Sequence, residues 1–164
     1  MPIVTNADRM PRTAHLATKQ AEDRTIEKAI AILATRLSHR DTLSTPDAVH
    51  QFLRLQAAGL NHEVFAVMFL DPQRRLIAYE PMFRGTLTEM SVYPREIVRR
   101  ALELGAHALI LHHNHPAGPC TPTPQDLTAT HLIRAALGLV GVQVEDHVIT
   151  SEDGAASMAD QGLL

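Results

Sequence analysis

The sequence predicts an α/β domain built on a mixed β-sheet, in which parallel and antiparallel strand pairs occur together. Apolar runs of strand length alternate with segments whose apolar residues recur at helical spacing, in the order β-β-(β)-α-β-α-β after N-terminal helices. Of the 164 residues, 45% are hydrophobic and 20% are charged, so the chain can bury one core of adequate size. Aromatic residues are scarce and tryptophan is absent, which predicts an aliphatic core.

The N-terminal region is predicted to form a tail followed by two helices. Residues 1–21 mix proline, threonine, asparagine and charged residues without periodicity, which indicates a mobile tail or an arm that contacts a partner. From Thr25 onward, apolar residues recur at the spacing of a helix face: Ile26, Ile30, Leu33 and Leu37. A second helix begins within residues 44–47, where Thr45 is the N-cap and is followed by a proline and an acid, and it ends at Gly59.

A β-hairpin follows these helices. Residues 64–70 form a nearly continuous apolar run, and the Asp-Pro-Gln-Arg sequence at 71–74 is typical of a turn. Residues 76–79 are apolar again, so the two runs are predicted to pair as antiparallel strands with a longer loop. Residues 83–87 are a candidate third strand.

The C-terminal half alternates helices and strands. Residues 94–104 have a helical apolar stripe and are followed by a stop glycine, and residues 106–112 read as a buried central strand. Three prolines and a glycine make the loop at 116–122 stiff and irregular. A helix from 123 to about 139 and a final strand over 142–150 complete the predicted order.

The strongest functional signal is the pattern H-x-H-x7-T-x2-D, formed by His113, His115, Thr123 and Asp126. Two imidazoles and one carboxylate are a ligand set of catalytic zinc, which keeps a further position open for water. Residues i and i+2 of a strand point to the same face, so both histidines can reach one ion. Asp126 would turn back from the first turn of the following helix. Alternatively, Asp126 is an ordinary helix-start acid that accepts hydrogen bonds from backbone N–H groups.

A hydrolytic zinc site also needs a general base, which takes a proton from water. Glu63, just before the first predicted strand, and Glu80, just after the second, are both candidates, and the spacing does not choose between them. Thr123 has two candidate roles. Its hydroxyl could donate to the oxyanion of a tetrahedral intermediate, or its oxygen could cap the helix N-terminus.

The charge of the chain argues against a nucleic-acid partner. The net charge is −3, without the basic excess that phosphate neutralisation requires. Four arginines are close together in sequence and form either a local basic patch or a solvated helix face: Arg84, Arg95, Arg99 and Arg100.

A cytoplasmic location is the expectation from three absences in the sequence. No apolar run approaches the roughly 18 residues of a membrane span, so no membrane association is expected. The N-terminus lacks the pattern of a secretory signal. Cys120 is the single cysteine, which excludes an internal disulfide and suits a reducing compartment.

Six segments together resemble the RadC-type domain of the JAMM (MPN+) metalloprotease-like superfamily. They are E-V-F-A-V-M-F-L-D, F-R-G-T-L, Y-P-R-E-I-V, H-N-H-P-A-G, T-P-T-P-Q-D and D-H-V-I. The resemblance covers residues 44–164, which leaves residues 1–43 as an N-terminal tail and helix. It implies a curved mixed sheet flanked by helices, with the layering of the cytidine deaminases.

The resemblance also implies roles for individual residues. His113, His115 and Asp126 match the family's zinc ligands, and Glu63 matches its glutamate better than Glu80, because the family's glutamate opens the first long strand. Thr123 stands where the family has serine, and its extra methyl group can crowd the oxyanion position.

Two further segments are compared with the family. Asp146-His147 matches a family D-H pair, for which a structural hydrogen bond or the orientation of a metal ligand is expected. The family loop usually reads H-N-H-P-S-G-D-P-T-P-S, whereas this chain has Ala117, Pro119 and Cys120. Cys120 could offer a thiolate near the metal, although an incidental role is preferred.

The resemblance implies a Zn²⁺-dependent hydrolase of the JAMM type that acts on a peptide or isopeptide bond of a protein or peptide substrate. An alternative is a DNA-repair-associated scaffold or DNA-processing protein with a structural or vestigial metal, which the family name suggests and the charge does not support. A third hypothesis, phosphodiester hydrolysis, is the least favoured, because two metal ions at ~4 Å are better suited to it.

Overall fold

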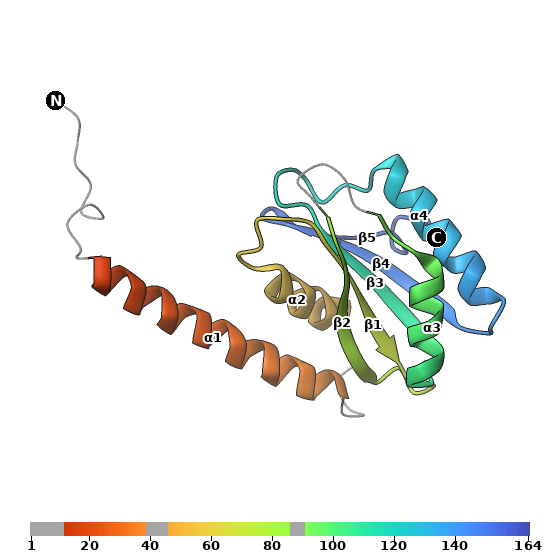
Figure 1. The fold of residues 1–164 in the computed structure, drawn as a ribbon, viewed down its shortest axis with the longest axis horizontal. Helices are drawn as coiled ribbons and strands as arrows, with labels where there is room; N and C mark the ends of the chain where they lie inside the picture. Colours follow the sequence, from red (N-terminus) through yellow and green to blue (C-terminus); the bar gives the residue numbers. More distant parts are fainter. Residues whose placement is uncertain (1–11, 39–45, 86–90) are drawn as a thin grey trace.

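The computed structural model describes residues 12–38, 46–85 and 91–164, and within them a five-stranded sheet has helices on both faces (Figure 1). The helices are α1 (Arg12–Ser38), α2 (Pro46–Ala57), α3 (Pro94–Leu104) and α4 (Pro124–Gly138). The strands are β1 (Val64–Leu70), β2 (Leu76–Arg84), β3 (Ala108–Asn114), β4 (Gln143–Ser151) and β5 (Gly154–Ser157). The predicted α/β class with a mixed sheet is confirmed.

The order of strands across the sheet is β2-β1-β3-β4-β5, so the sheet is open and β3 is its central strand. β3 pairs antiparallel with β1 and parallel with β4. The parallel pair is joined by α4, because a chain that re-enters the sheet in the same direction needs a crossover connection. Every residue of β3 is buried, as expected for a strand with neighbours on both sides and helices on both faces.

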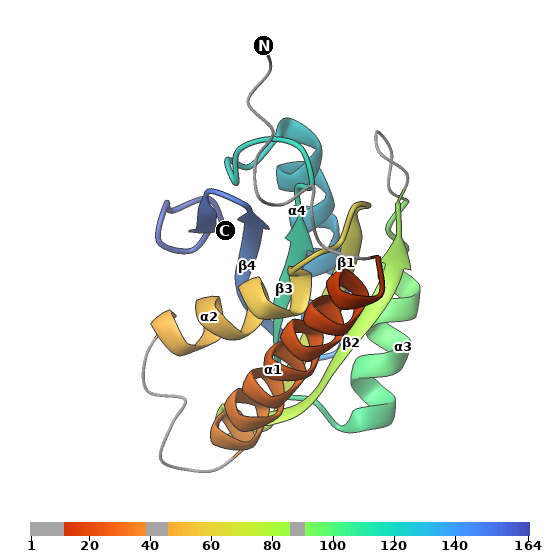
Figure 2. The same cartoon turned by 90° about the vertical axis from the view of Figure 1, so that its left-hand side faces the viewer.

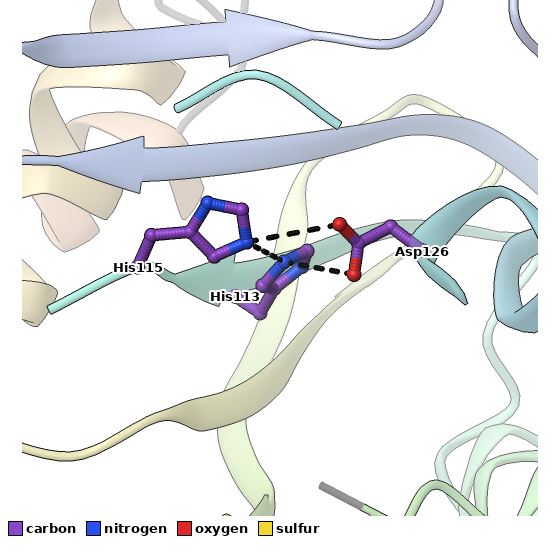
Figure 3. A group of neighbouring side chains, drawn as sticks. All are labelled: His113, His115 and Asp126. Carbon is purple, nitrogen blue, oxygen red and sulfur yellow. Dashed lines mark hydrogen bonds and ion pairs between the residues drawn. The ribbon is translucent and has the colours of Figure 1, made fainter. Parts of the chain in front are cut away.

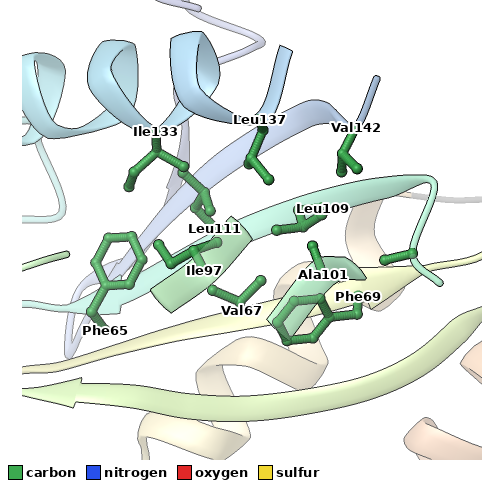
Figure 4. Close-up of a cluster of buried hydrophobic side chains, with 11 residues drawn as sticks. Phe65, Val67, Phe69, Ile97, Ala101, Leu109, Leu111, Ile133, Leu137 and Val142 are labelled. Atoms are coloured by element: carbon green, nitrogen blue, oxygen red, sulfur yellow. The ribbon is translucent and has the colours of Figure 1, made fainter. Parts of the chain in front are cut away.

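One face of the sheet packs against α3 and α4 (Figure 4). Alternate side chains of β1 and β3 point to this face and meet the apolar sides of the two helices. The buried cluster contains Phe65, Val67, Phe69, Ile97, Ala101, Ala106, Leu109, Leu111, Ile133, Leu137 and Val142. It fixes α4 against β3, and the residues that carry the candidate site chemistry lie at one end of this contact.

The opposite face is covered by α2 and the C-terminal part of α1 (Figure 2). The remaining side chains of β1 and β3 pack there against the helices in a second buried cluster: Leu37, Val49, Phe52, Leu53, Met68, Leu70, Ala108, Ile110 and Val148. The N-terminal part of α1 projects away from the sheet (Figure 1). In the ranges above, no helix has the length and apolar character needed to cross a bilayer.

The helix predicted from Thr25 onward begins earlier, at Arg12, so residues 12–21 are not the predicted mobile tail but belong to α1. This part of the helix contains three alanines, an arginine, a lysine and a glutamine, which favour helices through backbone propensity, and its single leucine does not make an apolar stripe. A search for apolar periodicity therefore missed it. The alternative of an arm that contacts a partner stays a prediction. Residues 1–11 and the predicted N-cap Thr45 lie outside the described residues.

The candidate third strand is also wrong where the structure describes it, because Phe83 and Arg84 continue β2. Phe83 pairs with Phe65 and Pro81 pairs with Ala66, so Met82 forms a bulge between them. β2 is an edge strand, which tolerates a proline that would interrupt a central one. Residues 86–87 lie outside the described residues.

Candidate metal centre

The end of β3 and the start of α4 bring the three predicted ligands together. His113 is the last but one residue of β3 and points to the face covered by α4, where Asp126 lies in the first helical turn. His115 follows the strand, and its backbone N–H donates to the carbonyl oxygen of Thr150 on β4, at 2.8 Å. The parallel neighbour thus holds the backbone of the second histidine in line with the first.

The ligand atoms face one another (Figure 3). Nε2 of His113 is 3.0 Å from Nε2 of His115 and 3.2 Å from Oδ1 of Asp126, and Nε2 of His115 is 3.7 Å from Oδ2 of Asp126. Tetrahedral zinc with bonds of 2.0–2.1 Å separates two nitrogen ligands by about 3.3 Å. The observed separations bracket this value, so the three side chains fit one zinc ion.

The chemistry of His115 fits a metal as well. Its Nδ1 is 2.8 Å from the carbonyl oxygen of Pro119, which can only accept, so Nδ1 donates. A neutral ring then presents a lone pair at Nε2, toward the nitrogen of His113. The hydrogen bond with Asp126 is the main cause that raises the pKa of His115. A raised pKa means that the surroundings stabilise a positive charge at this ring, as a binding site for a cation requires.

Asp126 combines the two roles that the sequence left open. Its Oδ1 faces His113, while its Oδ2 accepts from the backbone N–H and from the hydroxyl of Thr123, both at 2.7 Å. Burial favours a raised pKa for Asp126, but the hydrogen bonds with both histidines and Thr123 outweigh it and hold this pKa far below its usual range. The carboxylate is therefore ionised, as a metal ligand must be.

Thr123 is the N-cap of α4, in a capping box with Asp126. Its oxygen accepts from the backbone N–H of Asp126 at 3.3 Å, and its one hydroxyl proton is donated to Asp126 Oδ2. In this arrangement the hydroxyl orients a ligand, and it can reach an oxyanion only after that bond is broken.

Of the two candidate bases, Glu63 lies at the site. It lines a cavity of about 440 Å³ together with the three ligands, Thr123, His147 and other residues. Glu80 instead faces Arg100 of α3, whose Nε donates to Glu80 Oε2 at 2.8 Å, and the pKa of Glu80 is lowered mainly by this hydrogen bond. Glu80 does not line the cavity.

Asn114, between the two histidines, holds the segment that carries Glu63. Its Oδ1 accepts from the backbone N–H of Val64 at 2.8 Å, and its Nδ2 donates to the carbonyl oxygen of His62 at 3.0 Å. The carbonyl oxygen of Glu63 accepts from Gly85 N at 2.9 Å. The backbone of the candidate base is thereby fixed to the strand of the ligands. This role of Asn114 was not predicted from the sequence, although a polar residue at the end of a buried strand was a signal.

The contacts of two buried residues behind the ligands, His147 and Thr130, were also not predicted from the sequence. His147 of β4 approaches His113 with Nε2 at 2.8 Å from Nδ1, and Thr130 of α4 lies beyond it. Complete burial, and then the charge of His113, lower the pKa of His147 well below its ordinary value. Asp146 does not reach the ring of His147, because its Oδ1 accepts from the backbone N–H groups of His147 and Ala159.

His112 lies on the opposite face of β3 from His113, because successive residues of a strand point to opposite faces. Its ring nitrogens are each 2.9 Å from a hydroxyl oxygen, those of Tyr79 and Thr150. Burial lowers the pKa of His112 to about 3, with a smaller contribution from His113. Cys120 is half-buried in the loop after His115 and does not line the cavity.

The arginines of α3 are balanced by glutamates. Arg95 and Arg99 pair with Glu96 at 3.3 and 3.2 Å, and Arg100 pairs with Glu103 at 3.1 Å in addition to Glu80. This pairing favours the solvated helix face over the basic patch, the two alternatives that the sequence left open.

Two further cavities adjoin the site. A cavity of about 720 Å³ shares His115 with it and extends to the end of α2 and the β4–β5 turn. A cavity of about 450 Å³, without a charged residue in its lining, shares Val92, Gln125 and Ala129 with it and lies between α3 and α4. The candidate ligands thus lie between two recesses large enough for ligands.

Comparisons with known proteins agree with this arrangement. The family model described as "RadC-like JAB domain" matches residues 43–163. A "UPF0758 protein" of Leptothrix cholodnii is 50% identical over 139 residues, which are 85% of this chain and 63% of that protein. Proteins with the same name from an Acidovorax species and from Delftia acidovorans are each 52% identical over 139 residues, again 85% of this chain, and 58% and 62% of their own length. The chain therefore spans about 60% of the length of these relatives. Because the family model covers the sheet, α2 to α4 and all three candidate ligands, the chain belongs to the family of RadC-like JAB domains.

Proposed function

We propose that this chain is a zinc-dependent hydrolase of the JAMM type that cleaves a peptide or isopeptide bond. The observation that carries the proposal is one cavity lined by the three convergent ligand side chains and by Glu63. An extended substrate is supported by the recesses on two sides of this cavity, since a polypeptide has side chains on both sides of the bond that is cleaved.

His113, His115 and Asp126 would hold the ion. When bound, Zn²⁺ lowers the pKa of water toward ~7 and polarises a carbonyl group. The carboxylate of Glu63 takes a proton from the attacking water and returns it to the leaving amine, which is general base and then general acid catalysis. Thr123 keeps the carboxylate of Asp126 in place through its hydroxyl and backbone N–H.

Metal content tests the site directly. Elemental analysis of purified wild type, without added zinc and after zinc is supplied, should give about one zinc per chain, and the double variant His113→Ala/His115→Ala should have none. Absence of zinc from the wild type after zinc is supplied would overturn the proposal.

The role of Glu63 is tested by Glu63→Gln, with Glu80→Gln as the matched control. Both variants lose one carboxylate charge, but only Glu63 lines the cavity. We expect Glu63→Gln to keep its zinc and to lose at least about 100-fold in turnover of a fluorogenic peptide and lysine-isopeptide pool, given the usual contribution of a general base. Glu80→Gln should retain turnover. Equal activity of the two variants would remove Glu63 from the mechanism.

No specific observation favours the competing proposals. For a DNA-associated scaffold, the arginines of α3 are already paired with glutamates. For phosphodiester hydrolysis, the described part of the chain offers one group of three metal-binding side chains rather than a two-metal clamp. DNA binding with a steep dependence on salt would reopen the first of these.

A further inference from the structure

A chain of buried hydrogen bonds runs behind His113 and returns to Asp126. His113 Nδ1 is 2.8 Å from His147 Nε2, His147 Nδ1 is 2.6 Å from Thr130 Oγ1, and Thr130 Oγ1 is 2.6 Å from the backbone carbonyl oxygen of Asp126. The exposed fractions of His113, His147 and Thr130 are 2%, 0% and 0%. This hydrogen-bond chain thus links the candidate metal ligands His113 and Asp126 through residues of β3, β4 and α4, and the residues along it are buried from water.

The donor of each bond in this hydrogen-bond chain can be assigned by starting from the carbonyl oxygen of Asp126. A carbonyl oxygen only accepts, so the single hydroxyl proton of Thr130 is donated to Asp126 O. The reverse choice would place two acceptors 2.6 Å apart in a buried site, which is costly. The Oγ1 of Thr130 must then accept from His147, whose Nδ1 therefore carries a hydrogen.

The assignment continues to the metal ligand. With its hydrogen on Nδ1, a neutral His147 has a lone pair at Nε2 and accepts from Nδ1–H of His113. The ring of His147 is 0% exposed, and a charged imidazolium is costly in a buried position. A neutral His113 with its hydrogen on Nδ1 has a lone pair at Nε2, the atom that faces His115 and Asp126.

We propose that Thr130 and His147 are positioning residues that fix the tautomer of His113, so that its Nε2 is free to bind zinc. The inference rests on the proposed metal site. It assigns the two residues a role in metal affinity rather than direct contact with substrate. Phe65 packs beside both rings, with centroids 5.4 Å from that of His147 and 6.2 Å from that of His113, and limits their movement.

The two histidine ligands therefore differ in what fixes them. The Nδ1–H of His115 donates to the backbone carbonyl of Pro119, which no substitution can turn into a donor. The tautomer of His113 depends on a side-chain hydroxyl at the end of the chain. This dependence makes the proposal testable by a change at Thr130, which is hydrogen-bonded to Asp126 O and His147 rather than to His113 and does not line the cavity.

The experiment compares Thr130→Val, Thr130→Ser and the control Thr128→Val in the full chain. Thr128 lies on the same helix, is exposed, and donates its hydroxyl to Pro124 O at 3.0 Å, so its variant loses the same atom outside the hydrogen-bond chain. Zinc affinity is measured by competition with a chelating dye. The ring tautomer of His113 is measured by ¹⁵N NMR in the metal-free protein.

Thr130→Val is expected to lower zinc affinity by about 10- to 100-fold, the usual cost of losing an outer partner of a ligand, and to show a mixture of His113 tautomers. Thr130→Ser should restore both properties, and Thr128→Val should match the wild type. Wild-type affinity and a pure Nδ1–H tautomer in Thr130→Val would overturn the proposal. If Thr130→Val does not fold, the wild-type spectrum decides, because hydrogen on Nε2 of His113 contradicts the assignment. Failure of the wild type to bind zinc would instead overturn the proposed function, while the NMR result still tests the hydrogen-bond chain.

Discussion

Asp126 serves the helix and the candidate metal site with different oxygens. Oδ2 accepts two hydrogen bonds from Thr123, and Oδ1 faces Nε2 of His113. A carboxylate with one oxygen fixed in a capping box cannot rotate freely, so its second oxygen stays directed at the ion position. Local helix chemistry therefore does part of the work of pre-organising the ligand set.

At the scale of single residues, substitution of Thr123 tests the contribution of its hydroxyl, because the backbone N–H that also donates to Asp126 is unchanged. Thr123→Val should lower the free energy of unfolding of the metal-free protein by about 1 kcal/mol, because the cap is lost. It should also weaken zinc binding, because Oδ2 of Asp126 loses one of its donors. Thr123→Ser keeps the hydroxyl and should be close to wild type in both urea denaturation and zinc titration. A loss of equal size in the serine variant would assign the effect to the methyl group instead.

The grouping of the three candidate ligands could be predicted from the sequence. The resemblance also implied a structural or ligand-orienting role for Asp146-His147, but the contact of His147 with His113 could not be predicted. His113, His115 and Asp126 are close in the chain, so the alternation of a strand and one helix start suffice to bring them together. His147 reaches His113 only through the parallel register of β3 and β4, which pairs Leu111 with His147. No rule of local spacing gives that register. Thr130 lies four residues after Asp126, and residues four apart share a helix face. Its position next to Asp126 could therefore have been predicted.

At the scale of elements, α3 ends where its sequence predicts. Gly105 has φ of 62°, and its N–H bonds to the carbonyl oxygens of Ala101 and Leu102 at the C-terminus of the helix. A left-handed backbone favours glycine, because a β-carbon would clash with the following carbonyl.

The glycines of α3 and α4 allow a matched test of this point. A β-carbon would meet nothing within 4 Å at either Gly105 or Gly138, but only Gly105 has a positive φ. Gly105→Ala should therefore lower the free energy of unfolding by about 1 kcal/mol, and Gly138→Ala should raise it by about 0.4–1 kcal/mol. Urea denaturation of both variants measures the two effects. Equal signs would show that backbone conformation does not decide them.

Helices and strands with a strong apolar periodicity, or with clear start and stop residues, could be predicted from the sequence. Strands that form only because they pair with a neighbouring strand could not. β1 and α3 have the predicted bounds because an apolar run and a helical stripe are local properties. β5 has the sequence Gly-Ala-Ala-Ser, which has low β-propensity and becomes a strand only by pairing with β4. The full length of β2 was missed because Pro81 interrupts the apolar pattern that an edge strand does not need.

At the scale of the whole molecule, the ligands are held by the contact between β3 and α4. A ligand that binds the folded state alone stabilises it by mass action. Zinc at about 100 times its dissociation constant is therefore expected to raise the free energy of unfolding by at most about 2.7 kcal/mol, the value for binding to the folded state alone. Thermal unfolding with zinc and with a chelator measures this difference. His113→Ala/His115→Ala is the control and should show no difference, and an equal response in that variant would place the bound zinc elsewhere.

All three candidate ligands lie within residues 113–126, while His147 and Thr130, which orient His113, come later in the chain. An unfolded chain keeps the two histidines and the aspartate within reach of one another, because a short loop is inexpensive to close. It therefore retains some affinity for zinc and is not a metal-free reference state. Zinc in the medium stabilises both the folded and the unfolded state. The measured rise in the free energy of unfolding is therefore smaller than the affinity of the folded protein alone would give. The difference between these two quantities reports what the fold, rather than the local sequence, adds to metal binding.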